Sequence, residues 1–308
     1  MDAGCPGGAW YRAHRVNAPR PNYLRTLLVL GRVSNLPTVW SNCLAGWLLA
    51  GGGAWSDFAL LCFATTALYV GGMYLNDAFD ARFDAQHRPE RPIPSGAMRV
   101  EDVWAWGFGW LGAGLACLFL FSQITIILAL LLVVAILVYD AVHKIFAFSP
   151  VLMASCRFFL VLVAASIGEN GITGSPQGAL PVWSALVMAC YIVGLSYLAR
   201  KESTKSPVRY WPCLFLAAPL VLALIVNPGP HQTRALVLIC VLGIWMVRCL
   251  TFAFWTPQRN IGRSVAGLLA GIPLVDWLSA WDGSWWTGLT FAALFGLALL
   301  FQRFVPAT

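Results

Sequence analysis

Asn76-Asp77-Ala78-Phe79-Asp80-Ala81-Arg82-Phe83-Asp84 ends an apolar run of the chain and places three carboxylates and one carboxamide within nine positions. If one helix continues through this stretch at about 100° per residue, these four polar side chains fall within an arc of about 100° on one face. Carboxylate and amide oxygens suit a hard cation such as Mg²⁺, which also takes oxygens from a phosphate ligand. The stretch therefore predicts a membrane helix whose end holds a metal, with Asn76, Asp77, Asp80 and Asp84 as ligands.

The composition is that of a membrane protein. Of 308 residues, 59% are hydrophobic and only 11% are charged, whereas a soluble domain carries about 25% charged residues. The net charge of +7 does not indicate a nucleic-acid partner, because the basic residues are spread between apolar runs and form no single patch. Residues 1–22 contain arginines but no apolar core, so no cleavable signal peptide is expected. The nine cysteines form no Cys-x-x-Cys pair, and we assign them neither a disulfide nor a metal.

Ten apolar runs are long enough to cross a lipid bilayer. They are 24–50, 56–79, 102–121, 123–142, 150–168, 179–199, 210–226, 234–255, 264–281 and 285–302. The last two also fit a re-entrant pair. We therefore expect an all-α polytopic membrane protein, a bundle of nine or ten transmembrane helices that forms one domain over 24–303 after a tail at 1–23.

Lysine and arginine gather in every second connection between these runs, and the other connections carry none except Arg234. By the positive-inside rule, both termini and the basic connections face the cytoplasm. The expected cytoplasmic loops lie at about 80–101, 143–149, 200–209 and 256–263. In a bacterium the membrane would be the plasma membrane.

A basic, proline-rich segment follows the acidic stretch directly, at residues 86–96. Its three prolines exclude a helix and predict an extended segment, which holds Arg88 and Arg91 beside the carboxylates. The planar arginine side chain binds phosphate oxygens in pairs. Metal-binding carboxylates next to such arginines predict a diphosphate site. The alternative is a membrane edge at which these charges only pair with each other.

The pattern Asn76-Asp77-x-x-Asp80-x-x-x-Asp84, followed by Arg91-Pro92-Ile93-Pro94-Ser95-Gly96, resembles the first signature of the UbiA superfamily of intramembrane prenyltransferases. Residues 31–38 are similar to that family's first-helix entrance, and Tyr139 to Lys144 resembles its Tyr-x-x-x-x-Lys segment. The resemblance covers residues 24–281, and the proline-arginine stretch is also similar to the EboC-like subgroup.

This resemblance implies a UbiA-like bundle with a cytoplasm-facing active-site mouth. It also implies transfer of a prenyl group, within the membrane, from a Mg²⁺-bound prenyl diphosphate to a small acceptor that we expect to be aromatic. The catalytic residues would be Asp80, Asp84, Lys144 and Asp140. The substrate-binding residues would be Arg32, Asn35, Arg88, Arg91, Arg157, Tyr139, Arg200 and Tyr197. The metal ligands would be Asn76, Asp77, Asp80, Asp84 and Glu202.

Two of these assignments have a structural alternative. Arg157 lies about two turns into the fifth run, so it either faces a wet or anionic cavity, where it contacts diphosphate, or extends to the interface. Asp140 either assists deprotonation of the acceptor or forms an ion pair with Lys144, and the ion pair is the favoured reading. For Asp276 we expect a structural or interfacial role, and for His87 and His143 no specific role.

The chain departs from the family at the end of the sixth run. A second aspartate-rich motif is expected there, but Glu202 is the only acid in segment 191–202 and Ala199 stands where aspartate is expected. Arg200 and Lys201 either contact phosphate in place of a second metal or only anchor the topology.

This weakened motif leaves a second function class open, a non-catalytic binder of lipid diphosphates or a biosynthetic accessory protein. A secondary transporter is the third class. It should show paired halves with matching broken helices near the middle of the membrane. The sequence shows no such repeat, so this class is the least favoured.

Overall fold

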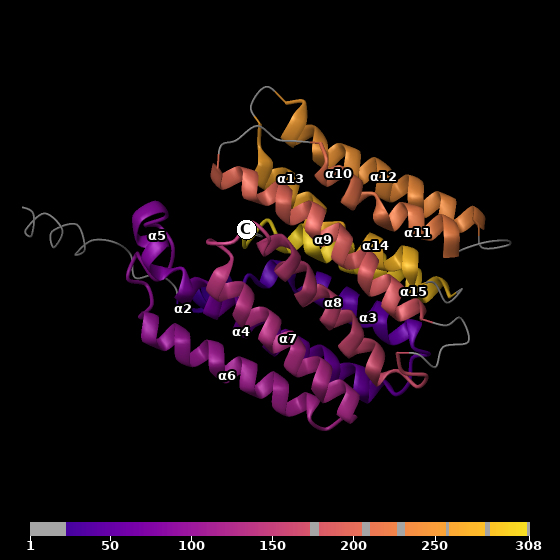
Figure 1. The fold of residues 1–308 in the computed structure, drawn as a ribbon, viewed down its shortest axis with the longest axis horizontal. Helices are drawn as coiled ribbons and strands as arrows, with labels where there is room; N and C mark the ends of the chain where they lie inside the picture. The colour runs from indigo at the N-terminus through magenta and orange to yellow at the C-terminus, as the bar shows by residue number, and fades with distance from the viewer. Residues whose placement is uncertain are drawn as a thin grey trace, which may run out of the picture.

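The computed structural model describes residues 23–172, 179–204, 210–226, 232–256, 259–280 and 284–306. This part of the chain folds into helices, with no strand among the described residues (Figure 1). The helices are α2 (Tyr23–Leu30), the 3-10 helix η1 (Val33–Asn35), α3 (Leu36–Leu49), α4 (Trp55–Phe79), α5 (Ala81–His87), α6 (Val100–Leu118), α7 (Gln123–Val142), α8 (Ser149–Ile167), α9 (Leu180–Thr204), α10 (Pro212–Leu216), α11 (Ala218–Val226), α12 (Gln232–Phe254), α13 (Ile261–Ala270), α14 (Ile272–Ser279) and α15 (Trp285–Phe301).

Within the described residues, six stretches are helical, long and apolar enough to cross a membrane. They are Trp55–Phe79, Gln123–Val142, Ser149–Ile167, Leu180–Arg200, Gln232–Phe254 and Ile261–Ser279. Two shorter apolar stretches, Pro212–Ile225 and Trp285–Phe301, accompany them. The all-α, integral-membrane prediction is confirmed, and the count of nine or ten spans stays a prediction.

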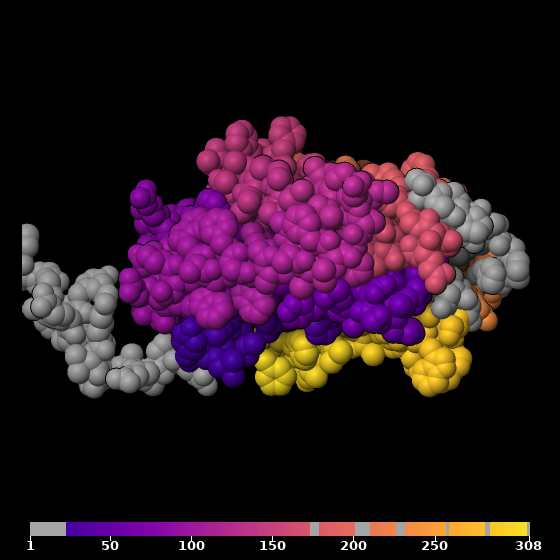
Figure 2. All heavy atoms as spheres, turned by 90° about the horizontal axis from the view of Figure 1, so that it is seen from below, coloured from indigo at the N-terminus to yellow at the C-terminus, as the bar shows by residue number. Residues whose placement is uncertain are grey.

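The helices form two groups, each around its own apolar core. One core draws its side chains mainly from α3, α4, α6, α7 and α8, and the other mainly from α9 to α14. Helices α8 and α9 pack together and join the groups. In Figure 2 the chain from α3 to α7, indigo to magenta, covers one face, and the yellow C-terminal helix α15 lies along α3, against which it packs.

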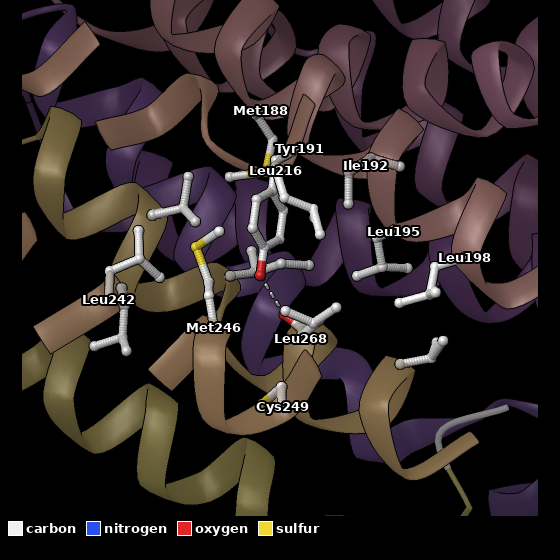
Figure 3. Close-up of a cluster of buried hydrophobic side chains, with 14 of the residues drawn as sticks. Met188, Tyr191, Ile192, Leu195, Leu198, Leu216, Leu242, Met246, Cys249 and Leu268 are labelled. Atoms are coloured by element: carbon white, nitrogen blue, oxygen red, sulfur yellow. Dashed lines mark hydrogen bonds between the residues drawn. The ribbon is translucent and has the colours of Figure 1, made fainter. Parts of the chain in front are cut away.

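Tyr191 lies at the centre of the second core, fully buried among Met188, Leu216 and Met246 (Figure 3). Its hydroxyl donates a hydrogen bond of 2.9 Å to the carbonyl oxygen of Leu268. A buried phenol needs such a partner, because an unpaired hydroxyl in an apolar core is costly. This bond connects α9 to α13 across the core.

Helices α4 and α6 approach closely through glycine. A Cβ atom built on Gly71 would lie 2.8 Å from the carbonyl oxygen of Gly107, and one built on Gly107 would lie 2.6 Å from the side chain of Leu75. Gly71 faces backbone atoms and therefore requires glycine, whereas a side chain at position 107 would force Leu75 to shift. This packing fixes the axis of α4, whose last turn carries Asn76 and Asp77.

The first apolar run, 24–50, is not one helix as expected. It divides into α2, η1 and α3, and the break is at Arg32, which has a positive φ of 42°. Pro37 lies in the first turn of α3, where its missing N–H does no harm. The break directs the Arg32 side chain toward the end of α4.

Two later runs, 210–226 and 264–281, are also interrupted. Helix α11 begins one residue before Pro219, and α14 begins one residue before Pro273. A proline inside a helix removes one backbone hydrogen bond and its ring clashes with the carbonyl four residues earlier, so each run breaks just ahead of its proline.

The acidic stretch itself lies on two helices, which corrects the expectation of one. Helix α4 ends at Phe79, Asp80 forms the junction, and Asp84 belongs to α5. In Figure 1, α5 turns away from the direction of α4. The two acids therefore do not extend one straight helix face.

The segment 86–96 is expected to be extended and free of helix, but α5 continues to His87, and residues 88–96, although not helical, are not extended. The N–H of Ser95 donates to the carbonyl of Arg91 at 2.9 Å, and the N–H of Ala97 donates to Pro92 at 3.0 Å. The φ that proline imposes suits tight turns as well as extended chain. The folded turns return Arg91 to the acidic residues.

Candidate active site

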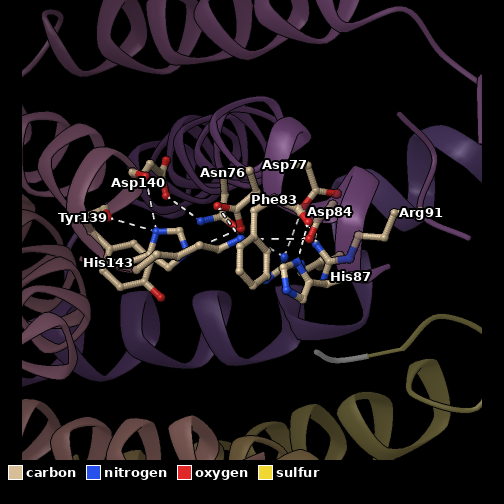
Figure 4. A network of polar contacts seen from close by, with 12 residues as sticks. Asn76, Asp77, Phe83, Asp84, His87, Arg91, Tyr139, Asp140 and His143 are labelled. Atoms are coloured by element: carbon tan, nitrogen blue, oxygen red, sulfur yellow. Dashed lines mark hydrogen bonds and ion pairs between the residues drawn. The ribbon is translucent and has the colours of Figure 1, made fainter. Parts of the chain in front are cut away.

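A network of buried acids and surrounding cations forms at the junction of α4 and α5 (Figure 4). Asn76, Asp77, Asp80 and Asp84 are between 2% and 8% exposed. Burying a carboxylate is costly unless cations or hydrogen-bond donors compensate it. The network must therefore contain those partners.

Arg91 bridges two of the carboxylates. Its Nη1 atom lies 2.9 Å from Oδ1 of Asp77 and 3.4 Å from Oδ2 of Asp84. Arg32 contacts the same Oδ1 of Asp77 at 3.1 Å. Two arginines that are far apart in the sequence thus meet at one carboxylate oxygen, as the assignment of both to the site requires.

Lys144 bridges the other two acids from the turn after α7. Its Nζ lies 2.9 Å from Oδ1 of Asp80, 3.9 Å from Oδ1 of Asp84, and 3.6 Å from the centre of the Phe83 ring. The expected Asp140–Lys144 ion pair is therefore wrong. The only feature of the sequence that points to the Phe83 contact is that Phe83 lies between Asp80 and Asp84.

His143 also contacts the site, which corrects the expectation that it has no specific role. Its Nε2 lies 3.4 Å from Oδ2 of Asp80, and its ring stacks on Tyr139 with centroids 5.0 Å apart. The sequence places it beside Lys144 without showing which way it points. Tyr139 thus reaches the site through a ring contact with His143.

Asn76 joins Asp140 to the network. Its Nδ2 donates to Oδ1 of Asp140 at 3.0 Å, while its Oδ1 accepts from Arg32 at 3.2 Å. Among the described atoms, Oδ2 of Asp140 is buried and has no hydrogen-bond partner. One carboxylate oxygen beside the cluster is therefore available to a ligand or a proton.

The two acids that flank Phe83 have different electrostatic surroundings. Burial opposes the ionisation of Asp80, but hydrogen bonds from His143 and Lys144 outweigh it, so the pKa of Asp80 lies below its ordinary value. Burial raises the pKa of Asp84 above its ordinary value, and the positive charges of Arg91 and Lys144 oppose this only in part. Asp80 is therefore the more firmly ionised of the two.

The acids do not form a finished metal cage. Within the described part of the chain, no three or more Asp, Glu, His or Cys side chains are arranged to hold a metal ion. The cage of four ligands on one helix face is not preformed, because the helix breaks at Asp80 and cations lie between the carboxylates. The donor chemistry still fits Mg²⁺, which proteins commonly bind through one or two carboxylates together with waters and phosphate oxygens.

The family follows from a sequence comparison. The model of the UbiA prenyltransferase family matches residues 37–275 of this chain. The chain belongs to the UbiA prenyltransferase family. The match confirms the resemblance to this family that the acidic stretch indicated.

Among relatives, the chain is similar to digeranylgeranylglyceryl phosphate synthases of archaea. It is 28% identical over 180 residues to the one from Methanoregula boonei, a match that covers 57% of this chain and 59% of that protein. It is 34% identical over 118 residues to the one from Methanothrix thermoacetophila, covering 38% and 44%. The chain thus spans less than two thirds of the length of these curated relatives.

Solved structures confirm the UbiA fold. A structure of digeranylgeranylglyceryl phosphate synthase aligns with 90% of this chain and 99% of its own, with a TM-score of 0.57 and 18% identity. A UbiA homologue from Archaeoglobus fulgidus, solved with DMAPP and Mg²⁺, aligns with 91% and 99%, with a TM-score of 0.51 and 14% identity. At these identities the likeness concerns the fold alone.

In this UbiA chain, Arg157 lies outside the carboxylate network. Its guanidinium donates to the carbonyl oxygen of Thr38 at 3.2 Å, to Oγ1 of Thr38 at 3.0 Å, and to Oδ1 of Asn42 at 2.7 Å. Asn42 in turn donates to Asp276 at 2.8 Å, and Ser41 does so as well. Arg157 thus belongs to a polar network that joins α3, α8 and α14, which agrees with the structural role expected for Asp276, and its diphosphate contact stays a prediction.

Three other predicted substrate-binding residues also stand apart from the acids. Arg88 forms no ion pair with Asp77, Asp80 or Asp84, all of which are described. Asn35 is the last residue of η1, directly before α3, and is 5% exposed. The Tyr197 ring packs edge-on against Trp211, with centroids 4.6 Å apart.

The end of α9, which is expected to contact phosphate or to anchor the topology, binds a turn of the chain. Arg200 donates to the backbone carbonyls of Phe146 and Ala147, in the turn between α7 and α8. The side chain of Glu202 lies outside the described part of the structure, so its assignment as a metal ligand stays a prediction.

Proposed function

We propose that this UbiA chain is an intramembrane prenyltransferase, which transfers a prenyl group from a Mg²⁺-bound prenyl diphosphate to an acceptor. One observation carries the proposal: at the end of a membrane helix, Arg91 and Lys144 each bridge two buried carboxylates. These groups supply what a magnesium diphosphate needs, which is anionic oxygen for the metal and donors for the phosphate. The archaeal relatives named as synthases of a prenylated lipid, and the fold neighbour solved with DMAPP and Mg²⁺, support this reading.

In this proposal Asp77, Asp80 and Asp84 hold the metal, with Asn76 beside them. When bound, Mg²⁺ neutralises negative charge on the departing diphosphate. Glu202 is a further candidate ligand from α9.

Arg32, Arg91 and Lys144 change partners when the diphosphate binds. They now neutralise the carboxylates, and the same donors suit phosphate oxygens. The cations are therefore near the leaving group before it departs, so little reorganisation is needed as charge develops.

Aromatic faces lie next to these charges. Phe83 sits under Lys144, and Tyr139 stacks on His143 beside Asp80. An allylic cation is stabilised by such faces and must be kept from water. The free oxygen of Asp140 is the candidate acceptor for the proton that the attacking group loses.

Two acceptor classes remain within the proposal. The chemistry of prenyl transfer favours an electron-rich ring, whereas the relatives' names point to a glyceryl phosphate that already carries one prenyl chain. The distribution of Lys and Arg supports an active site and both termini on the cytoplasmic side. A reporter fused to either terminus and tested for protease access in sealed vesicles would check this orientation.

Purified protein in detergent, incubated with Mg²⁺ and geranylgeranyl diphosphate, tests the function through pyrophosphate release. The acceptor arms are geranylgeranylglyceryl phosphate, an aromatic carboxylic acid and no acceptor. We expect release that needs both Mg²⁺ and one acceptor. Tight binding of the diphosphate with no release in any arm would contradict catalysis.

That result would favour the second candidate, a non-catalytic binder of lipid diphosphates. The observation behind it is the end of α9, where Ala199 and Arg200 occupy the place of an acidic motif. Replacing Glu202 by Ala asks whether this end supplies a metal ligand. Unchanged Mg²⁺ dependence in that variant would show that the site works with one motif.

A further inference from the structure

Arg200 holds the turn between α7 and α8. Its Nη1 lies 2.8 Å from the carbonyl oxygen of Phe146, 2.9 Å from that of Ala147 and 2.9 Å from Oγ of Ser149. The guanidinium is charged, and hydrogen bonds from a charged donor are shorter and stronger than neutral ones. Through these contacts the end of α9 is tied to a turn more than fifty residues earlier.

Apolar burial contributes little to the position of this turn. Ile145 is 76% exposed, Phe146 54% and Phe148 73%. Side chains that stay exposed add little packing energy. The turn is therefore held by its own backbone bonds and by Arg200.

The same turn begins with the two residues that reach Asp80. His143 and Lys144 follow directly after the last residue of α7. Lys144 has no helix around it to fix its backbone, yet its Nζ meets Asp80 at 2.9 Å. A shift of the turn would move Lys144 off both Asp80 and Phe83, because Lys144 contacts both from this one position.

We propose that Arg200 is a positioning residue. It fixes the α7–α8 turn and thereby sets the place of Lys144 at the diphosphate, without touching the diphosphate itself. This role gives α9 a part in the site that needs no second acidic motif. The inference rests on the proposed function, since it assumes that Lys144 contacts a diphosphate.

A double-mutant cycle tests this role, with calorimetric binding of geranyl diphosphate in the presence of Mg²⁺ as the readout. We expect Arg200→Ala to weaken binding roughly tenfold in the parent and less than about twofold in a Lys144→Ala background. Equal losses in both backgrounds would overturn the inference, because a direct phosphate contact or a general loss of structure acts independently of Lys144.

Ser149→Ala gives a second test that does not depend on how stable the Arg200 variant is. It removes one acceptor of Arg200 and no charge, so binding should weaken in the same direction by a smaller factor. Affinity equal to that of the parent would contradict the positioning role. Arg263→Ala is the matched control, because Arg263 lies over the ring of Phe252 and not on this turn, and its affinity should equal that of the parent.

The two proposals fail in different ways. If the parent protein binds no geranyl diphosphate at all, the proposed function is wrong. If the parent binds and the cycle shows no coupling, only the role of Arg200 is wrong.

Discussion

Two charged clusters in this protein use the same residue types in different ways. At the end of α4, aspartates contact Arg and Lys directly, and those cations keep between 16% and 30% of their side-chain surface exposed. Between α3, α8 and α14, Asp276 and Arg157 are joined through Asn42, and Asp276 is 1% exposed. The clusters differ in how their charges meet: in the first, cations contact the carboxylates directly, whereas in the second Ser41 and Asn42 bond the Asp276 carboxylate and only Asn42 connects it to Arg157.

The carboxylates at the end of α4 can exchange their partners, whereas Asp276 keeps its partners. A carboxylate whose direct partner is a partly exposed cation can exchange it for a metal, because the released cation can bind phosphate or water. An interior aspartate whose partners are buried serine and asparagine has no such replacement. The charge pattern alone does not mark a site, because what differs between the clusters is whether a cation contacts the carboxylate directly or through a neutral side chain.

The largest expected effect is on stability, at the interior cluster. Asp276→Ala leaves Ser41 and Asn42 without their acceptor and removes the link to Arg157, and each buried donor left unpaired costs about 1–3 kcal/mol. The melting temperature in detergent should fall strongly, and activity should fall with the folded fraction. Asp276→Asn should lose less, because it keeps an acceptor oxygen. A parent-like melting temperature for Asp276→Ala would mean that this cluster is not structural.

The next effect is on chemistry, at the end of α4. Asp80→Ala removes a metal ligand of the proposed site and should lower Mg²⁺-dependent pyrophosphate release by at least about 100-fold. Its melting temperature should stay close to that of the parent, opposite to Asp276→Ala. The control is Glu101→Ala, whose carboxylate pairs with the exposed Arg99 at 3.4 Å. Parent-like activity of Asp80→Ala would rule out the metal assignment.

Arg91→Gln tests whether the cations at the end of α4 leave the carboxylates for phosphate when a diphosphate binds. Geranyl diphosphate affinity should fall about tenfold, because a charged donor to phosphate is lost. Affinity for Mn²⁺ alone, measured by electron paramagnetic resonance as a probe for Mg²⁺, should rise, because Asp77 and Asp84 lose a competing cation. Arg99→Gln should change neither quantity. If both affinities fall in Arg91→Gln, Arg91 is a structural part of the metal site and not an exchangeable partner.

The smallest expected effect is at His143. His143→Phe keeps an aromatic ring against Tyr139 and loses the 3.4 Å contact with Asp80. Lys144 still contacts Asp80 at 2.9 Å in this variant, so kcat should fall only about two- to threefold. A loss comparable to that of Asp80→Ala would indicate that His143 takes part in the reaction directly.

The sequence predicted the acidic end of α4 together with Arg91, because these residues are neighbours along the chain. The run from Asn76 to Asp84 and the nearby Arg91 fall within one helix end and the turns after it, so local geometry keeps them together. The exact partners were less predictable. Asp140 and Lys144 are four residues apart, a spacing that predicts an ion pair on a helix, but α7 ends at Val142. Lys144 therefore leaves the helix face and meets Asp80.

The roles of Arg157 and Arg200 were not predictable from their own surroundings. Arg157 lies within an apolar run and Arg200 directly follows one, and the sequence allows a phosphate contact for each. Their hydrogen bonds instead go to Thr38 and to Phe146. These partners lie 119 and 54 residues away, so only the packing of α8 on α3 and of α9 on α8 brings them within reach.

By itself the sequence determined the membrane character, the helical class, the family and the stretch that carries the acids, since composition, run length and short motifs are properties of consecutive residues. The tertiary structure decided where helices break in detail, which cation neutralises which carboxylate, and which acids contact a cation directly. Those outcomes depend on the packing of helices that are distant in sequence. A charged side chain is stabilised by whatever the fold brings within about 3 Å of it, and sequence spacing does not contain that information.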